Sequence, residues 1–166
     1  VTSGLFLRTS RLESTPIGIL VRESQWGFAV VVGMHLLGLT LSVGIVVWFD
    51  LRLLGLVLRA FPVSTVYRRV MPWALSGFAL MFLSGGALFA AYAVSAYPNM
   101  YFRVKIAALF LAGVNAAFYH LVTERRFAHV DAEARQPLTT RMAGIVSIVA
   151  WAIVILAGRL MSYTMF

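Results

Sequence analysis

The chain has 166 residues, of which 61% are hydrophobic and 12% are charged, and its formal net charge is +8 at pH 7. Soluble domains carry about 25% charged residues, so this composition excludes an ordinary soluble domain. The chain has no cysteine, which excludes disulfides, thiolate metal sites, iron–sulfur clusters and the attachment of c-type haem. The positive charge is explained by basic residues that flank membrane segments, so we expect no nucleic-acid partner.

Four apolar segments follow a polar N-terminal segment, residues 1–25, which lacks the apolar core of a secretory signal. The four segments cover about residues 26–49, 72–96, 102–122 and 142–162. Each is long enough to cross a hydrocarbon core of ~30 Å at ~1.5 Å per residue. Short connections favour antiparallel neighbours. The predicted fold class is therefore all-α, with residues 1–166 forming a single domain, an up-down four-helix bundle in the lipid bilayer.

Local signals predict where the helices begin and end. The first helix is expected to continue beyond its span until Pro62 stops it, and Pro72 is expected in the first turn of the second span. Asn99 is a candidate N-cap for the third span, and Thr139 or Thr140 for the fourth.

The distribution of basic residues predicts the orientation of the bundle. The loops after the first and third spans hold eight of them, Arg52, Arg59, Arg68, Arg69, Arg125, Arg126, Arg135 and Arg141, against six on the other side, Arg8, Arg11, Arg22, Arg103, Lys105 and Arg159. Cytoplasmic loops carry the excess of basic residues. We therefore expect a multi-pass protein of a bacterial inner membrane, with both termini, including residues 1–25, on the periplasmic side.

The residue types inside the spans limit the chemistry. Phosphate-binding, dinucleotide-binding, zinc-protease and serine-hydrolase motifs are absent from the sequence. The four predicted spans contain no Asp or Glu, which disfavours a proton relay or a cation-coordinating transporter. Three histidines without thiolate or carboxylate help are too few for a convincing zinc site.

His35 lies in the middle of the apolar run "VVVGMHLLGLTLSVGIVV" and is the strongest candidate for a site. A neutral imidazole in an apolar bundle is a suitable iron ligand for b-type haem. Three glycines are expected to clear space for the macrocycle. Gly38 lies on the same helix face as His35, and Gly85 and Gly86 lie in the second span. Two cations nearer the outer membrane edge, Lys105 and Arg159, are candidates to meet the haem propionates.

The second iron ligand is left open by the sequence. His120 is the obvious candidate, but centred spans place it ~15 Å from His35 in depth. Three arrangements remain: an inclined haem that bridges both histidines, a haem on His35 with another ligand or none, or two separate sites. Met34, Met81 and Met142 lie in spans and are the other possible ligands. The cofactor prediction is therefore one or two haem b groups.

Two motifs carry a family resemblance. "HLLGLTLSVGIVVWFDLRLLG" and "FRVKIAALFLAGVNAAFYH" resemble a group of bacterial four-helix inner-membrane proteins of unassigned function. The pattern is also similar to HemJ-type protoporphyrinogen oxidases and to the membrane domain of copper-resistance protein D. In HemJ-type proteins the first-helix His and the third-helix Lys are functional and b-type haem is bound, so the resemblance implies roles for His35 and Lys105. The chain lacks the aromatic-rich stretch of HemJ, having "SVGIVVWFDLRL" in its place.

These features predict a membrane cytochrome b that moves electrons between a quinone or other membrane partner and a redox partner outside the cytoplasm. A single haem between four helices leaves little room for a substrate. A subunit of a larger complex, with other membrane or periplasmic redox subunits, is therefore expected rather than a complete enzyme. The alternatives are a HemJ-like enzyme that acts on porphyrin, and a copper-handling or structural membrane subunit.

Overall fold

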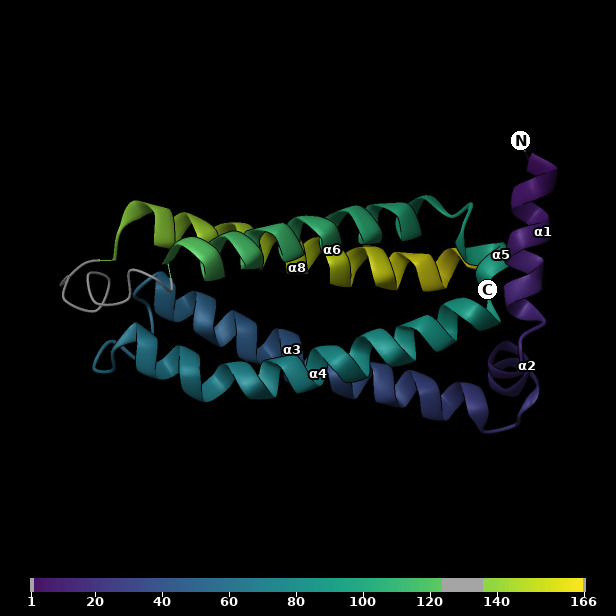
Figure 1. Cartoon of the computed structure of the whole chain (residues 1–166), viewed down its shortest axis with the longest axis horizontal. Coiled ribbons are helices and arrows are strands. Elements are labelled where there is room, and N and C mark those ends of the chain that lie inside the picture. The colour runs from purple at the N-terminus through teal and green to yellow at the C-terminus, as the bar shows by residue number, and fades with distance from the viewer. Residues whose placement is uncertain (1, 124–135, 166) are drawn as a thin grey trace.

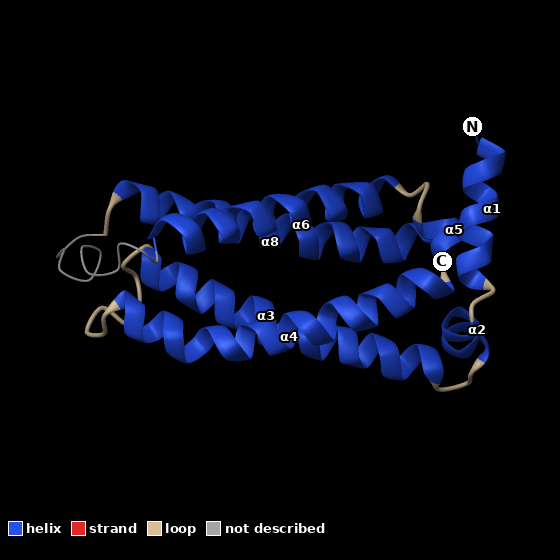
Figure 2. Ribbon diagram, in the orientation of Figure 1, coloured by secondary structure: helices blue, strands red, loops and turns tan. Residues whose placement is uncertain are grey.

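The computed structural model describes residues 2–123 and 136–165, and this part of the chain consists of helices and connecting loops without strands (Figure 2). The elements in chain order are α1 (Thr2–Glu13), α2 (Pro16–Glu23), α3 (Gly27–Leu53), α4 (Val63–Ala91), α5 (Ala93–Ala96), α6 (Met100–Phe118), the π-helical turn η1 (Tyr119–Thr123) and α8 (Leu138–Met165). The predicted all-α fold class is confirmed.

Four helices, α3, α4, α6 with the start of η1, and α8, are long and apolar enough to cross a membrane. They indicate a multi-pass membrane protein. They run alongside one another, whereas α1 lies across one end of the bundle (Figure 1). We call this the terminal end, because both chain termini lie there, and the opposite end, where α3 connects to α4, the loop end.

The bundle consists of two helix pairs, α3 with α4 and α6 with α8 (Figure 1). In the first pair the backbones touch. A Cβ atom on Gly38 would lie 2.7 Å from the Met81 amide nitrogen, and one on Gly77 would lie 2.6 Å from the Ser42 nitrogen. Small residues of this kind let membrane helices approach closely. The two pairs meet mainly between α3 and α8, where Val43 packs with Trp151 in a buried apolar cluster.

The first helix ends earlier than predicted. It stops at Leu53 rather than near Pro62, because Gly55 adopts a left-handed conformation with φ +72°. The Leu56 amide donates to the Leu51 carbonyl at 2.9 Å and the Gly55 amide to the Arg52 carbonyl at 3.0 Å. These two bonds form a Schellman motif, which satisfies the last carbonyls of a helix.

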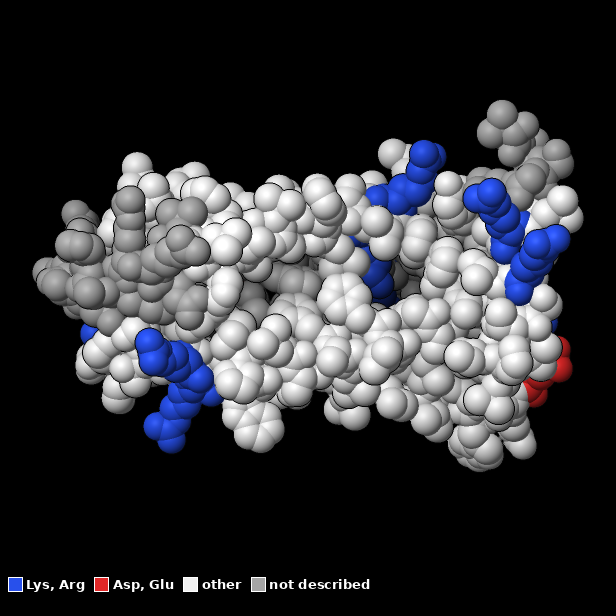
Figure 3. Space-filling model, in the orientation of Figure 1, with Lys and Arg blue, Asp and Glu red and all other residues white. Residues whose placement is uncertain are grey.

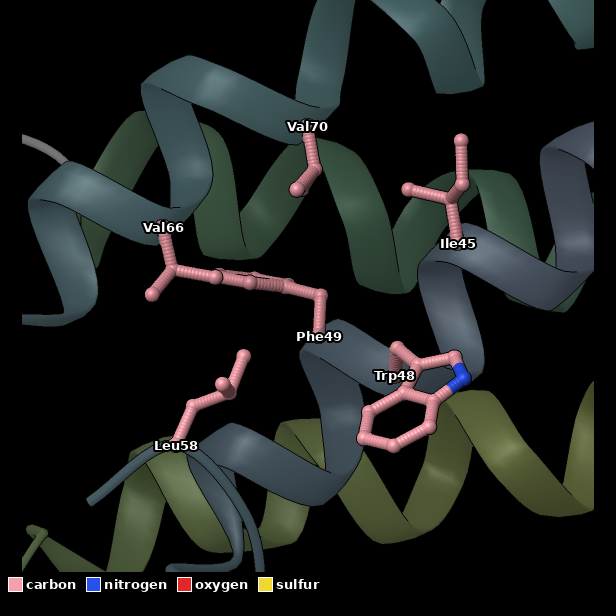
Figure 4. Close-up of a pocket in the computed structure, with 6 residues that line it drawn as sticks. All are labelled: Ile45, Trp48, Phe49, Leu58, Val66 and Val70. Carbon is pink, nitrogen blue, oxygen red and sulfur yellow. The ribbon is translucent and has the colours of Figure 1, made fainter. Parts of the chain in front are cut away.

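The segment after this stop folds back onto α3. Arg52 is 7% exposed, and its guanidinium donates from Nε and Nη2 to the Phe61 carbonyl at 3.1 and 2.7 Å. Figure 4 shows Phe49 pointing toward Val66 of α4 in a depression of about 260 Å³. All six residues that line this depression are apolar, namely Ile45, Trp48, Phe49, Leu58, Val66 and Val70.

Three other boundary predictions have mixed outcomes. Pro72 lies inside α4, which begins nine residues earlier at Val63, so its placement in a first turn is wrong. The predicted N-cap Asn99 is confirmed, since its side chain accepts from the Tyr101 and Phe102 amides at 2.9 and 3.4 Å.

The cap prediction for the fourth span is wrong, because α8 begins at Leu138 and both Thr139 and Thr140 lie within it. Three basic residues used for the predicted orientation, Arg125, Arg126 and Arg135, lie outside the described residues.

The N-terminal helices are tied to the terminal end. Thr15 caps α2 by accepting from the Gly18 amide at 3.3 Å. Glu13 accepts from the Val94 amide at 2.9 Å and pairs with Arg22 at 3.3 Å. These contacts hold α1 and α2 against α5, close to where α3 begins.

Candidate functional site

His35 is a half-buried residue of α3 whose imidazole ring packs against α4. The ring packs tightly against Gly85, where a larger residue would crowd it. A Cβ atom on Gly85 would lie 3.0 Å from His35 Cε1 and 3.3 Å from Nδ1. Gly85 therefore makes room for the imidazole itself.

The hydrogen bonds of His35 fix its tautomer. Its Nδ1 lies 3.0 Å from the Met81 carbonyl oxygen and 3.2 Å from Ser84 Oγ. A carbonyl oxygen only accepts, so Nδ1 must carry the hydrogen. The Ser84 hydroxyl donates to the Leu80 carbonyl at 2.6 Å, which leaves its lone pairs to accept from the same Nδ1–H.

The consequence is a free lone pair on the other ring nitrogen. With Nδ1 protonated in a neutral ring, Nε2 is unprotonated, and no hydrogen bond to it is found within residues 2–123 and 136–165. Metal-binding histidines are commonly held in this way, with the distal N–H donated to a carbonyl so that the ring is oriented and the ligand nitrogen is basic.

Lys105 of α6 belongs to the other helix pair. Its side chain is half-buried and lies along α8, with Nζ 3.6 Å from the position of a Cβ atom on Gly158. The ammonium is close enough to the His35 ring for an electrostatic interaction. Figure 3 shows the surface hollowed between the two helix pairs, with a basic side chain visible in the hollow.

The other residues predicted to surround the cofactor have different environments. The backbone of α4 lies directly against Gly38, whereas Gly86 is exposed and has nothing within 4 Å of its Cβ position. Arg159 is exposed and stacks on Tyr163, with its guanidinium carbon 5.0 Å from the ring centroid and Nη2 3.2 Å from the hydroxyl.

His120 occupies a different place in the bundle. It is exposed, lies in the π-helical turn η1, and its Nδ1 is 2.8 Å from the Tyr67 hydroxyl. Because Tyr67 precedes Met81 by fourteen residues on α4, the two histidines are separated by ~21 Å along that helix. The structure does not bring His35 and His120 to one metal position.

Sequence reasoning missed the groups that position the predicted residues. The Met81 carbonyl is a backbone atom and leaves no trace in the sequence, while Ser84 is signalled only by the small-residue run "SGG". Of the methionine candidates, Met81 is buried in the core, whereas Met34 and Met142 are 42% and 48% exposed. Within the part of the chain that the structure describes, no group of three His, Cys, Asp or Glu residues is placed to hold a metal ion.

Comparison with known proteins identifies one family. A model of a family of unknown function, DUF6644, matches residues 20–164. No curated protein and no solved structure matches the chain. The match covers α3, α4, α6 and all but the last residue of α8, and with them His35, Lys105 and His120. The chain therefore belongs to the DUF6644 family.

Proposed function

We propose that this protein is a membrane-embedded b-type cytochrome in which His35 would bind the haem iron. The proposal depends on one observation: Nδ1–H of His35 is donated to the Met81 carbonyl, which leaves the lone pair of Nε2 for a metal. When bound, the haem would supply reversible one-electron chemistry. The chain itself would hold and orient the ligand, exclude water and place a positive charge nearby.

The donor set suits haem better than a bare metal ion. A porphyrin supplies the equatorial ligands, so the protein needs to contribute only one or two axial groups. His35 offers one nitrogen, and Lys105 is a suitable partner for a propionate carboxylate. The ~21 Å between the levels of the two histidines favours a haem on His35 alone, or two separate sites, over a single haem that bridges both. A copper site is less well supported, because two candidate methionines face outward.

The position of His35 suggests where electrons would leave. His35 lies about two turns from the start of α3, in the half of the bundle nearest the terminal end. If both termini are periplasmic in a bacterial inner membrane, this half faces the periplasm. We propose that the protein passes electrons between a quinone or membrane partner and a periplasmic redox partner, as a subunit of a larger complex.

The direct test is a spectrum of the purified full-length protein, expressed with an ample haem supply. We expect a reduced-minus-oxidised difference spectrum typical of b-type haem. His35→Ala should abolish it, added imidazole should restore it, and His120→Ala should leave it in place. Size-exclusion profiles establish that each variant is folded. A folded wild-type protein without haem, or a His35→Ala variant with an unchanged spectrum, would refute the proposal.

The proximity of His35 and Lys105 favours one alternative, a membrane enzyme that oxidises a porphyrinogen. Purified protein would be incubated with a porphyrinogen and a quinone acceptor, and porphyrin formation followed by fluorescence. Turnover that is lost in Lys105→Ala but kept in Arg159→Ala would support this enzyme. No turnover by a haem-loaded protein would leave electron transfer as the function.

A further inference from the structure

A carboxyl group lies inside the membrane domain. The first predicted span ends at about residue 49, just before Asp50, whereas the membrane-spanning candidate α3 runs to Leu53 and includes Asp50. The residue is only 4% exposed. Its Oδ2 atom is buried and has no hydrogen-bond partner. A proton relay was disfavoured because the predicted spans contain no carboxylate. In the structure, a membrane-spanning helix does carry one.

The surroundings of Asp50 are almost entirely apolar. α8 approaches closely at Gly144, whose Cβ position is 3.1 Å from the Asp50 carbonyl oxygen, and the hydroxyl of Ser147, one turn further along α8, lies beside the Asp50 carboxyl. Leu53 packs beside Gly144 on the same face. The Asp50 carboxyl therefore faces α8 and one hydroxyl group.

The charged and titratable groups nearby do not pair with this carboxyl. Arg52, on the same helix, donates to the Phe61 carbonyl. Tyr67 of α4 and Tyr119 at the start of η1 pack around the neighbouring Phe49. Among the described residues, no ion pair joins Asp50 to a basic side chain.

We propose that Asp50 is a proton-binding site of the membrane domain, where its carboxyl is carried as the neutral acid. An ionised carboxylate without a counter-ion is very costly in an apolar interior, and protonation removes that cost. One carboxyl and one hydroxyl are too few oxygen ligands for a hard metal cation. Asp50 lies fifteen residues from His35, ~22 Å along α3, so this site is separate from the haem site.

Hydrophobic carbodiimides test this proposal because they react with protonated carboxyl groups inside membranes. The full-length protein in lipid vesicles would be treated with dicyclohexylcarbodiimide and its peptides mapped by mass spectrometry. We expect an adduct on Asp50 that is absent in Asp50→Asn. A water-soluble carbodiimide should instead label Glu13 and Glu23, which belong to the N-terminal helices.

Infrared spectroscopy gives a second readout that does not depend on reagent access. The wild-type protein should show the carbonyl stretching band of a neutral carboxylic acid, which Asp50→Asn should remove. Ser147→Ala should shift this band without removing it, because the serine hydroxyl lies beside the Asp50 carboxyl. Ser76→Ala, at an exposed serine of α4, should leave it unshifted. The proposal fails if folded wild-type protein gives no adduct at Asp50 and Asp50→Asn leaves the infrared band unchanged.

Discussion

His35 and His120 are both hydrogen-bonded to α4, yet their surroundings differ in every respect that matters for ligation. His35 is half-buried, its Nδ1–H is directed at a backbone carbonyl, and Gly85 makes room for its ring. His120 is exposed and shares a hydrogen bond with the phenol of Tyr67, which can donate or accept. The carbonyl fixes the tautomer of His35, whereas the phenol leaves that of His120 open.

Whether a histidine is ready to bind a metal depends on the hydrogen bond that its other ring nitrogen makes. A half-buried ring with a fixed N–H direction is already oriented for a metal, whereas an exposed ring must lose side-chain freedom on binding. The helix that carries each residue matters too. α3 packs against both α4 and α8, while η1 lies at the loop end of the bundle.

The largest expected effect comes from breaking the helix crossing beneath His35. Gly38→Ala would place a Cβ atom 2.7 Å from the Met81 nitrogen and so force α3 and α4 apart. We expect a loss of stability of about 3 kcal/mol or more, together with loss of haem. Gly44→Ala is the matched control, because nothing lies within 4 Å of that position, and it should change stability by about 1 kcal/mol or less. Denaturation in detergent measures the stability of both variants. Equal losses would contradict the close contact of α3 and α4 at Gly38.

Two neighbouring glycines of α4, Gly85 and Gly86, allow an effect on the His35 ring to be distinguished from a general effect on folding. Gly85→Ala would push a methyl group against the His35 ring, and we expect haem affinity to fall by about 10- to 100-fold, as for other groups that orient a metal ligand. Gly86→Ala faces open space and should keep wild-type affinity. Haem titration of the purified variants gives the comparison. If Gly86→Ala loses haem as well, the macrocycle itself lies against this face of α4, as the sequence suggested.

A smaller effect is expected on the His120 side. Tyr67→Phe removes the phenol that contacts Nδ1 of His120 and should reduce stability by about 1 kcal/mol, the net value of one hydrogen bond. The haem spectrum should not change, because Tyr67 lies fourteen residues from Met81 on α4. A shifted spectrum in this variant would indicate that His120 also binds the cofactor.

The smallest effect concerns the second acceptor of His35. Ser84→Ala leaves the Met81 carbonyl in place, so haem affinity should fall by less than about 10-fold. Ser76→Ala, on the exposed side of α4, is the control and should have no effect. If Ser84→Ala abolishes binding, the hydroxyl rather than the carbonyl orients the ring.

The parts of the fold that depend on long apolar runs could be predicted from the sequence. The four spans, the all-α class and the Asn99 cap come from composition and local chemistry, which act over short distances. The predicted end of the first helix was wrong because Pro62 was taken as the stop, although Gly55 in "DLRLLG" already permits a left-handed cap. Asp50 was left outside the predicted membrane segment for a different reason: that segment was drawn to end at about residue 49, whereas the membrane-spanning candidate α3 runs to Leu53.

The site could be predicted only in part. His35 and Lys105 stand out as polar residues in apolar runs, and that signal is local. Which groups meet them depends on how the helices cross, so the roles of Gly85 and the Met81 carbonyl could not be read from spacing alone. Arg159 has the right charge and depth but turns to Tyr163, a neighbour on its own helix.

The group that accepts the Nδ1–H of His35 is a main-chain oxygen, the carbonyl of Met81. This affects both how substitutions act on the imidazole and how it responds to helix movement. No side-chain replacement at position 81 deletes a carbonyl, so the basicity of the imidazole is protected from point mutation there. The same oxygen belongs to the rigid hydrogen-bonded ladder of α4 and moves only with that helix. Any movement of α4 relative to α3 would therefore change the hydrogen bond that orients the imidazole of His35, without any change of residue.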